Sequence, residues 1–378
     1  MSLSGIYFAL VLLFCACQLY VSIKWRTSSQ RIPTVILGSV FLLAICILAS
    51  KVTTPISSYS DLVRMQDEIN ITLVDGPSYL FQSYALNPGS ALLILIASVF
   101  GGIAFLQTFA CAIFYGSIML MIYLMYVRHY LSAYKYFSTI AAALVTAPFG
   151  DIIAGVRNYP SLALGLLGAS IFYLHRKRML GLLIIILATS IHFSVLVIIA
   201  IILAIHIRDK RLRFIVYVVI LGYSYISYQA AIIASNMGIA SASSLLQKMD
   251  GYYRFGNSYN ESFISTTYYL IALFSICVGV LAQIRLSHTY LDDEIFQYKR
   301  FSFILLLVCL GSAVTQTPLV RYSILFLFAS LPLHGITSVR EKYQNHSSDL
   351  LLRYVYILLI IGLAYCGYRL TNHLTLTL

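Results

Sequence analysis

The chain has 378 residues, of which 60% are hydrophobic and only 10% are charged, and its mean hydropathy is +0.87. A soluble domain of this length does not need so much apolar surface, so these values indicate a protein that is embedded in a lipid bilayer. The net charge of +12 is divided into short basic clusters between apolar runs, a pattern typical of cytoplasmic loops that argues against a nucleic-acid partner.

Twelve apolar runs predict an all-α, polytopic membrane protein. Several runs are shorter than the ~20 residues that a full crossing needs, so we expect about 10–12 crossings. The first run lacks a basic leading segment and a small-residue cleavage site, which predicts a spanning helix and not a removable signal. We find no internal repeat and expect residues 1–378 to form one membrane domain, with outer loops at about 51–100 and 236–262. The apolar runs lie near 4–23, 33–50, 101–127, 136–150, 160–174, 179–190, 192–207, 214–235, 263–284, 301–316, 323–338 and 354–368.

Basic clusters between these runs predict the orientation of the chain. They hold 18 of the 25 lysines and arginines, and the positive-inside rule places such clusters in the cytoplasm. Both termini are then outside. The clusters are KWRTSSQR (24–31), RHYLSAYK (128–135), HRKR (175–178), RDKRLR (208–213), RLSHTYLDDEIFQYKR (285–300) and VREKYQNHSSDLLLR (339–353).

Two stretches need a separate interpretation. Residues 179–207 are almost continuously apolar and have basic clusters at both ends, yet an odd number of crossings cannot return the chain to the same side. We therefore predict a tight hairpin whose tip falls near the sequence TSIH, with His192 at the outer face. Residues 88–100 (PGSALLILIASVF) are too short to span and predict a helix that lies along the outer leaflet or dips into it.

The apolar run at 160–174 is preceded by an arginine. In VRNYPSLAL, Asn158 is a good helix N-cap and Pro160 suits a first helical turn, so we expect a helix that begins here with Arg157 at its outer end. A guanidinium at the edge of the hydrocarbon region is costly, and it either snorkels to lipid headgroups or binds another anion.

Two later helix starts repeat this arrangement. In TSIHFSVLVII, Ser190 can cap a helix that has His192 in its first turn, and in TQTPLVRYSILFLF, Pro318 suits a first turn with Arg321 one turn further on. All three N-termini are expected to face outward, where free N–H groups, the positive end of the helix dipole and arginine favour phosphate oxygens. Together the three ends predict a pocket for a pyrophosphate at the outer leaflet.

The expected outer loops supply further candidates. The segment SSYSDLVRMQDEINITLVDGPSY holds most of the outer acids (Asp61, Asp67, Glu68 and Asp75), and a carboxylate there is a candidate general base toward a sugar hydroxyl. The segment MDGYYRFGNSYNES combines tyrosines, arginine and amides, which suit sugar rings, although tyrosine also belongs to interfacial belts. The seven cysteines fall inside apolar runs, and no outer group of histidines and acids has metal-ligand spacing, so we expect neither a metal nor another cofactor.

Three short segments carry a resemblance to a known family. GVRNYPSLAL, ATSIHFSVL and TPLVRYSIL, in this order, resemble the signature positions of EpsG-like polysaccharide polymerases, which belong with Wzy-type O-antigen and capsule polymerases. The resemblance covers nearly the whole chain in layout. It implies a GT-C-like fold and a metal-independent glycosyltransferase of the bacterial inner membrane. Such enzymes join undecaprenyl-pyrophosphate-linked oligosaccharide repeat units at the outer face. The implied partners are those substrates, the bilayer, and a flippase and chain-length regulator of the same pathway, without nucleic acid.

The resemblance also implies roles for individual residues. Three positions match the family's pattern: its first Arg is Arg157, its His followed by Ser is His192, and its late Arg is Arg321. Asp61 matches an acidic residue of the first large outer loop, although the tyrosine that usually follows closely is absent. We expect Arg157 and Arg321 to stabilise the departing pyrophosphate. His192 either deprotonates the attacking hydroxyl or hydrogen-bonds the leaving phosphate, and Asp61 is the rival base. Further candidates for substrate binding are Arg64, Asn158, Tyr159, Ser194, Tyr253, Arg254 and Tyr322.

Two other functions are alternatives to polymerisation. A flippase or transporter of lipid-linked sugars needs charges deep within several helices, whereas the ionisable residues here lie at the ends of the apolar runs. A membrane O-acyltransferase acting on surface glycans is the second alternative. The first apolar run lacks the Arg-x-x-x-Asp-x-x-Arg-Gly type of stretch that its best-known family carries there.

Overall fold

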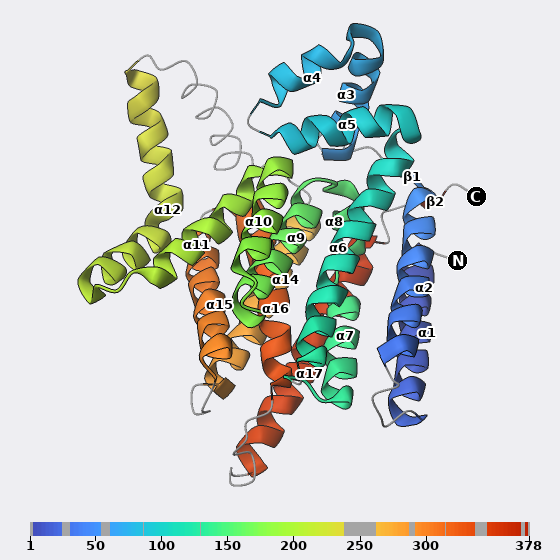
Figure 1. Cartoon of the computed structure of the whole chain (residues 1–378), viewed down its shortest axis with the longest axis vertical. Coiled ribbons are helices and arrows are strands. Elements are labelled where there is room, and N and C mark those ends of the chain that lie inside the picture. Colours follow the sequence, from blue (N-terminus) through green and yellow to red (C-terminus); the bar gives the residue numbers. More distant parts are fainter. Residues whose placement is uncertain are drawn as a thin grey trace. The chain divides into compact units, whose positions relative to one another are not determined.

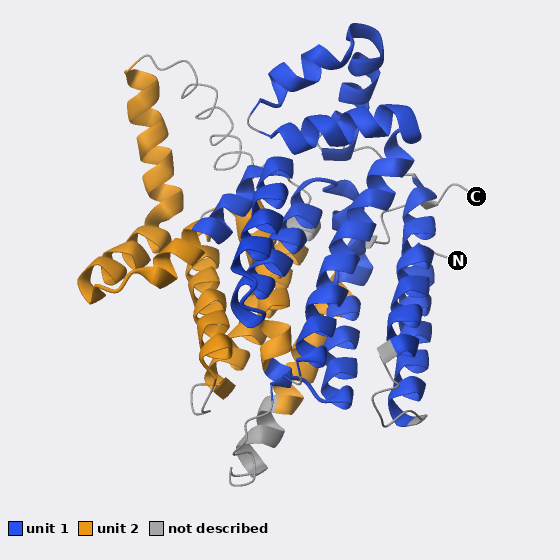
Figure 2. Ribbon diagram, viewed as in Figure 1, with its two compact units in different colours: residues 1–199, 334–344, 367–378 blue, residues 200–333, 345–366 orange. Residues whose placement is uncertain are grey.

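A computed structural model gives the fold of the chain (Figure 1). It describes residues 3–24, 31–53, 61–85, 87–128, 130–237, 262–286, 292–313, 315–336, 346–371 and 375–376. The structure is almost wholly helical and divides into two compact units (Figure 2). Unit 1 consists of Met1–Ile199, His334–Gln344 and Gly367–Leu378, and unit 2 consists of Ala200–Leu333 and Asn345–Cys366.

Most elements of unit 1 come from the first half of the chain. They are α1 (Leu3–Lys24), α2 (Arg31–Ser50), β1 (Val52–Thr53), α3 (Asp61–Asp75), α4 (Pro77–Ser83), α5 (Pro88–Phe100), α6 (Ile103–Val127), α7 (Ala133–Thr146), α8 (Phe149–Ala154), α9 (Asn158–Leu174), α10 (Arg178–Ile191), the 3-10 turn η2 (Phe193–Val195) and β2 (Thr375–Leu376). The strands β1 and β2 pair antiparallel, with Val52 opposite Leu376.

The remaining helices lie mainly in unit 2. They are α11 (Leu196–His206), whose first turn belongs to unit 1, α12 (Lys210–Asn236), α14 (Ser262–Arg285), α15 (Asp293–Gly311), α16 (Gln316–Gly335) and α17 (His346–Thr371). Within unit 2, the hydroxyls of Ser302 on α15 and Ser330 on α16 lie 2.9 Å apart and are buried. Gly311 of α15 lies against the backbone carbonyls of Ile220 and Leu221 on α12, where a larger side chain does not fit.

Six helices among the described residues are long and apolar enough to cross a membrane. Three shorter apolar helices accompany them, and at 1.5 Å per residue none of these covers the ~30 Å hydrocarbon core alone. The protein is therefore an all-α membrane protein with several candidate spans, as predicted, while the total of 10–12 crossings stays a prediction. The six candidate spans are Leu3–Ile23, Ile32–Ser50, Ile103–Val127, Lys210–Asn236, Thr266–Arg285 and Arg353–Leu370.

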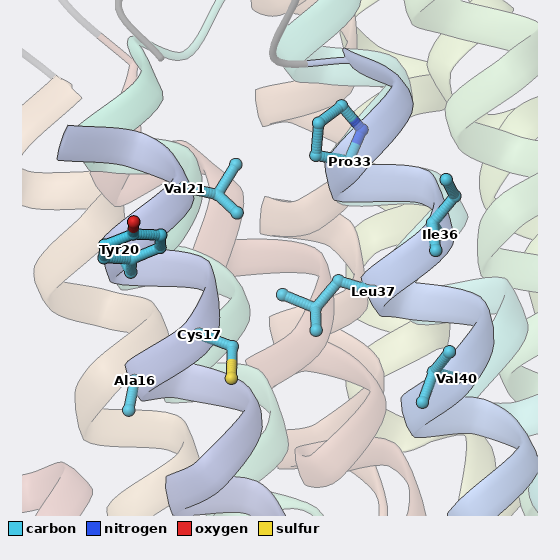
Figure 3. Close-up of a pocket in the computed structure, with 8 residues that line it drawn as sticks. All are labelled: Ala16, Cys17, Tyr20, Val21, Pro33, Ile36, Leu37 and Val40. Carbon is cyan, nitrogen blue, oxygen red and sulfur yellow. The ribbon is translucent and has the colours of Figure 1, made fainter. Parts of the chain in front are cut away.

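The groove between α1 and α2 illustrates an apolar surface on such helices. Figure 3 shows Cys17, Tyr20 and Val21 of α1 facing Pro33 and the aliphatic side chains that follow it on α2. None of the eight residues that line this groove carries a charge. Side chains of this kind suit lipid hydrocarbon, which needs no hydrogen bonds from the protein surface.

Helix α9 is buried along almost its whole length. Every residue of this helix except Leu164 is buried, which is the pattern of a helix that is packed on all sides. Its close neighbour is α10, because Gly168 and Gly181 allow the two backbones to approach: a Cβ at Gly181 would lie 2.7 Å from the carbonyl oxygen of Gly168. The packing of α9 fixes the position of its first residues, which belong to the candidate site.

Three helices between α2 and α6 build one end of unit 1. Figure 1 shows α5 running across the end of α6, with α3 and α4 beside it. In α3, Leu62, Met65, Ile69 and Thr72 are buried at spacings of three and four residues, so one face of an otherwise polar helix packs inward. The expected short helix at 88–100 is confirmed as α5, whereas α3 and α4 lie in a segment that we expected to be an outer loop.

The apolar runs locate most helices correctly, with two notable differences. The run at 136–150 is divided between α7 and α8, because Pro148 disfavours helical geometry at Ala147, which has extended backbone angles. Helix α15 begins at Asp293, inside the predicted cytoplasmic cluster and before the apolar run at 301–316, and acidic side chains in its first turn complement the helix dipole.

Candidate functional site

Arg157 precedes the first turn of α9. Its backbone occupies the N-cap position, its carbonyl accepts from the N–H of Ser161 at 3.2 Å, and its side chain makes no capping hydrogen bond. Pro160 lies in the first turn, as expected. The prediction that Asn158 caps the helix is wrong, because Asn158 is the first helical residue and its amide contacts a distant segment instead.

That distant segment begins with Asp61, the first residue of α3. Nη2 of Arg157 donates to Oδ1 of Asp61 at 3.1 Å, and Nδ2 of Asn158 donates to Oδ2 at 2.8 Å. Arg64, one turn further along α3, also donates to Oδ1. The two arginines differ in environment, since the side chain of Arg157 is 7% exposed and that of Arg64 is 57% exposed. Asp61 therefore ties the start of α3 to the start of α9.

Tyr84 completes this group of residues. It follows α4 directly, is buried, and its ring lies under the guanidinium of Arg157, with 5.4 Å between the Cζ atom and the ring centroid. This separation is in the range of a cation–π contact. Burial raises the pKa of the Tyr84 phenol, and the charge of Arg157 opposes part of that rise. We call Asp61, Arg64, Tyr84, Arg157 and Asn158 the Asp61 cluster.

Several buried polar atoms in and beside the Asp61 cluster have no hydrogen-bond partner among the described residues. They include one donor, Nε of Arg157, and two acceptors, Oδ1 of Asn158 and Oε2 of Glu68. Taken as whole residues, side chain and backbone together, Arg157 is 6% exposed and Asn158 is 2% exposed. Buried polar groups in folded proteins are nearly always hydrogen-bonded, and each exception costs about 1–3 kcal/mol. An unmatched donor and unmatched acceptors at one place make the Asp61 cluster a candidate binding site.

His192 marks the break between α10 and η2. The break lies where we predicted it, and the residue adopts an extended conformation between the two helical segments. The prediction that Ser190 caps the next helix is wrong: Ser190 lies within α10, and its hydroxyl donates to the carbonyl of Leu187 at 2.7 Å. His192 itself is the cap, since its Nδ1 accepts from the backbone N–H of Ser194 at 3.2 Å.

The capping contact selects a tautomer of the His192 ring. A neutral imidazole whose Nδ1 accepts a hydrogen bond carries its proton on Nε2 and presents that nitrogen as a donor. The hydroxyl of Ser194 lies 2.8 Å from the same Nδ1. Helix α5 supports this turn, because Oγ of Ser90 donates to the carbonyl of Ile191 at 2.5 Å.

No family model, curated protein or solved structure matches this chain. The resemblance to EpsG-like and Wzy-type polymerases is thus carried by the three short segments, and it stays a prediction.

The other predicted site residues have different surroundings. Arg321 and Tyr322 lie in the second turn of α16 in unit 2, and both are half-buried. Tyr159 is buried in unit 1 and packs edge-on against Phe114 of α6. Tyr253 and Arg254 lie outside the described residues. The structure thus brings Asp61, Arg64, Arg157 and Asn158 together, while the meeting of the three helix starts stays a prediction.

Tyr84 was missed by the sequence interpretation, and Glu68 was noted there only as one of several outer acids. A usable signal exists for Glu68, because Asp61, Arg64 and Glu68 recur at i, i+3 and i+7 and so share one face of a helix. Tyr84 has no such signal, since its contact with Arg157 joins residues 73 positions apart. Among the described residues, no three His, Cys, Asp or Glu side chains gather as a metal site requires, and the expected independence of metal stays a prediction.

Proposed function

We propose that this chain is a polysaccharide polymerase of the EpsG-like or Wzy type, with a GT-C-like fold, in the bacterial inner membrane. It joins undecaprenyl-pyrophosphate-linked oligosaccharide repeat units at the outer face. The donor is the growing glycan on its lipid pyrophosphate, and the acceptor is a lipid-linked repeat unit. A flippase and a chain-length regulator of the same pathway are the expected partners.

The observation that carries this proposal is the set of unmade hydrogen bonds at the Asp61 cluster. Nε of Arg157 needs an acceptor, and a phosphate oxygen is a good acceptor for a guanidinium. Oδ1 of Asn158 needs a donor, and a sugar hydroxyl supplies one. A sugar joined to a pyrophosphate offers both groups in one ligand.

In the proposed reaction, the acceptor hydroxyl attacks the anomeric carbon of the donor. The new C–O bond forms as the bond between that carbon and the phosphate oxygen breaks, and the electron pair leaves with the lipid pyrophosphate. Arg157 stabilises this developing charge, and the resemblance implies the same role for Arg321. Asp61 holds the guanidinium of Arg157 until a phosphate oxygen shares it. His192, as an Nε2 donor, hydrogen-bonds the leaving phosphate.

Purified protein, incubated in nanodiscs with a lipid-linked repeat unit, tests the proposal. We expect a ladder of products that differ by one repeat unit. Arg157→Lys and Arg321→Lys keep the charge and lose the planar fork, and we expect each to slow polymerisation about 100-fold while membrane abundance stays normal. Arg211→Lys, at an exposed position on α12, is the control and should behave as wild type.

Two results would contradict the proposal. Wild-type protein that yields no ladder from a competent lipid-linked repeat unit is not a polymerase of this kind. Full activity in both the Arg157→Lys and Arg321→Lys variants removes the pyrophosphate pocket and leaves Arg157 as a structural partner of Asp61.

A further inference from the structure

The proposed polymerisation requires a group that receives the proton of the acceptor hydroxyl. Asp61 is a poor choice, because both of its oxygens already accept hydrogen bonds from three side chains of the Asp61 cluster. To receive a proton it would have to release Arg157, a buried cation that needs it as a counter-ion. These contacts make Asp61 a positioning residue for the guanidinium.

His192 is also unsuited to the task in this geometry. A general base needs an unprotonated atom within reach of the proton that it takes. In the neutral ring, Nδ1 is the unprotonated nitrogen, and it is engaged by the backbone N–H and the hydroxyl of Ser194. The other nitrogen carries a proton and can only donate.

Glu68 differs from both residues. It lies seven residues after Asp61, about two turns along the same face of α3. Its side chain is half-buried, and its Oε2 is buried without a hydrogen-bond partner among the described residues. A carboxylate oxygen in this state costs free energy, since burial removes its water contacts and no protein donor replaces them. A hydroxyl of a bound sugar supplies the missing donor.

Tyr84 connects Glu68 to the rest of the Asp61 cluster. Burial is the main cause of the raised pKa of the Tyr84 phenol; the charge of Arg157 lowers this pKa and the carboxylate of Glu68 raises it. The ring of Tyr84 also lies beneath the Arg157 guanidinium. Glu68 thus lies on the helix whose first residue, Asp61, binds Arg157, and the charges of Glu68 and Arg157 both act on the Tyr84 phenol.

We propose that Glu68 is the catalytic residue that accepts the proton from the attacking hydroxyl, and that Asp61 serves to position Arg157. This assignment rests on the proposed function. The proton passes from the acceptor oxygen to a carboxylate oxygen of Glu68 as the oxygen bonds to the anomeric carbon. The electron pair of the broken bond leaves with the pyrophosphate at Arg157, so that no further reactant is needed.

The test compares Glu68→Gln with wild type in the ladder assay, together with binding of the donor lipid in the absence of acceptor. Glutamine has the same shape and cannot take a proton, so we expect turnover to fall at least 100-fold and donor affinity to change less than twofold. Glu68→Asp keeps a carboxylate and should retain more activity than Glu68→Gln. Asp67→Asn is the matched control, because Asp67 is the neighbouring acid on the exposed face of α3, and it should keep wild-type activity.

Thermal unfolding separates this role from a structural one. Glu68→Gln removes a charge whose oxygen is buried without a partner, so its unfolding temperature should equal or exceed that of wild type. Asp61→Asn should weaken donor binding, because it loosens Arg157.

Three results would overturn the assignment. The first is a Glu68→Gln variant that keeps more than a tenth of wild-type turnover. The second is a Glu68→Gln variant that loses activity only because it unfolds, while Glu68→Asp is also inactive. The third is an Asp61→Asn variant that binds the donor normally but does not turn over. If the wild-type protein produces no ladder, the proposed function itself fails. That result is distinct from a failure of the Glu68 assignment, in which the wild-type protein still produces the ladder.

Discussion

Arg157 brings a full positive charge into the buried start of α9, and its neighbours show how the protein tolerates it. The guanidinium has one carboxylate partner, Asp61, and one aromatic face, Tyr84. A buried ion pair adds little net stability, because desolvation offsets the attraction, but removal of one partner is strongly destabilising. Because Arg157 and Arg64 both pair with Asp61, a buried and an exposed ion pair can be compared on the same carboxylate.

We expect Asp61→Asn to lower stability much more than Arg64→Gln. Loss of the carboxylate leaves Arg157 buried without its counter-ion, a change that typically costs about 3–5 kcal/mol. Loss of Arg64 removes an exposed ion pair, which is typically worth about 0–1 kcal/mol. The comparison is made by thermal unfolding of all variants in the same detergent, monitored by the fluorescence of an added dye. Equal shifts in unfolding temperature would mean that Arg157 does not depend on Asp61.

His192→Gln tests the tautomer that Ser194 selects. Glutamine donates and accepts hydrogen bonds but does not titrate in the working pH range. Because Nε2 of His192 is a donor in this geometry, we expect the variant to keep appreciable polymerisation activity, while His192→Ala loses it. Initial rates over the pH range of activity provide the measurement. If His192→Gln loses nearly all turnover yet retains donor binding, the imidazole is the base after all.

At the scale of elements, the site depends on how the helices of unit 1 dock on one another. Helix α5 meets the end of α10 through Ser90 and Gly89, next to the turn that holds His192. A Cβ at Gly89 would lie 2.9 Å from backbone atoms of Ser190, and backbone cannot move aside as a flexible side chain does. The glycine therefore sets the distance between α5 and the end of α10.

Gly89→Ala should separate these two elements. Overpacking of this kind typically costs about 1–3 kcal/mol, and we expect a lower unfolding temperature and a lower polymerisation rate. Gly367→Ala in α17 is the control, because among the described residues no atom beyond its chain neighbours and its own helix backbone lies within 4 Å of an added Cβ. The measurement is thermal unfolding alongside the ladder assay. A Gly89→Ala variant as stable and active as Gly367→Ala would show that α5 is not held closely at this point.

At the scale of the whole molecule, the hydrophobic helices determine which segments can cross the membrane, and the charges between them predict the orientation of the chain. Among the described residues, candidate spans occur both before and after the residues of the Asp61 cluster in the chain. The cluster lies on α3, the end of α4 and the start of α9, in segments that the charge pattern places at the outer face. The orientation of the chain thus decides which side of the membrane the chemistry faces.

Cysteine labelling tests this orientation. In a cysteine-free background, single cysteines at positions Ser58 or Asn257 should react with a membrane-impermeant reagent from outside, and those at Ser29 or Ser287 should not. These four positions lie outside the described residues, in segments that the charge pattern assigns to opposite faces. The reverse labelling pattern would invert the topology and move the Asp61 cluster to the cytoplasmic side.

The sequence by itself determined the class of the protein and the position of most helices. Apolar runs, prolines and a polar break in a long apolar stretch are local signals, and a helix forms from contacts between residues three or four apart. For this reason α6, α9 and α10 begin and end close to the expected residues, and the break falls at His192. The amphipathic helix α3 escaped notice because its apolar face is narrow and its remaining residues are polar.

Only the tertiary structure decided which of the candidate residues meet. Asp61 and Arg157 are 96 positions apart, and Tyr84 joins them from a third segment. Such contacts depend on how α3, the end of α4 and the start of α9 come together in unit 1, which no local periodicity encodes. The same arrangement gives residues other roles than expected. Asn158, expected as a helix cap, donates a hydrogen bond to Asp61, and Oε2 of Glu68 is buried without a hydrogen-bond partner among the described residues. Hydrophobic patterning specifies which face of a helix is buried, whereas the partner of a buried polar group is set by the three-dimensional arrangement of distant segments.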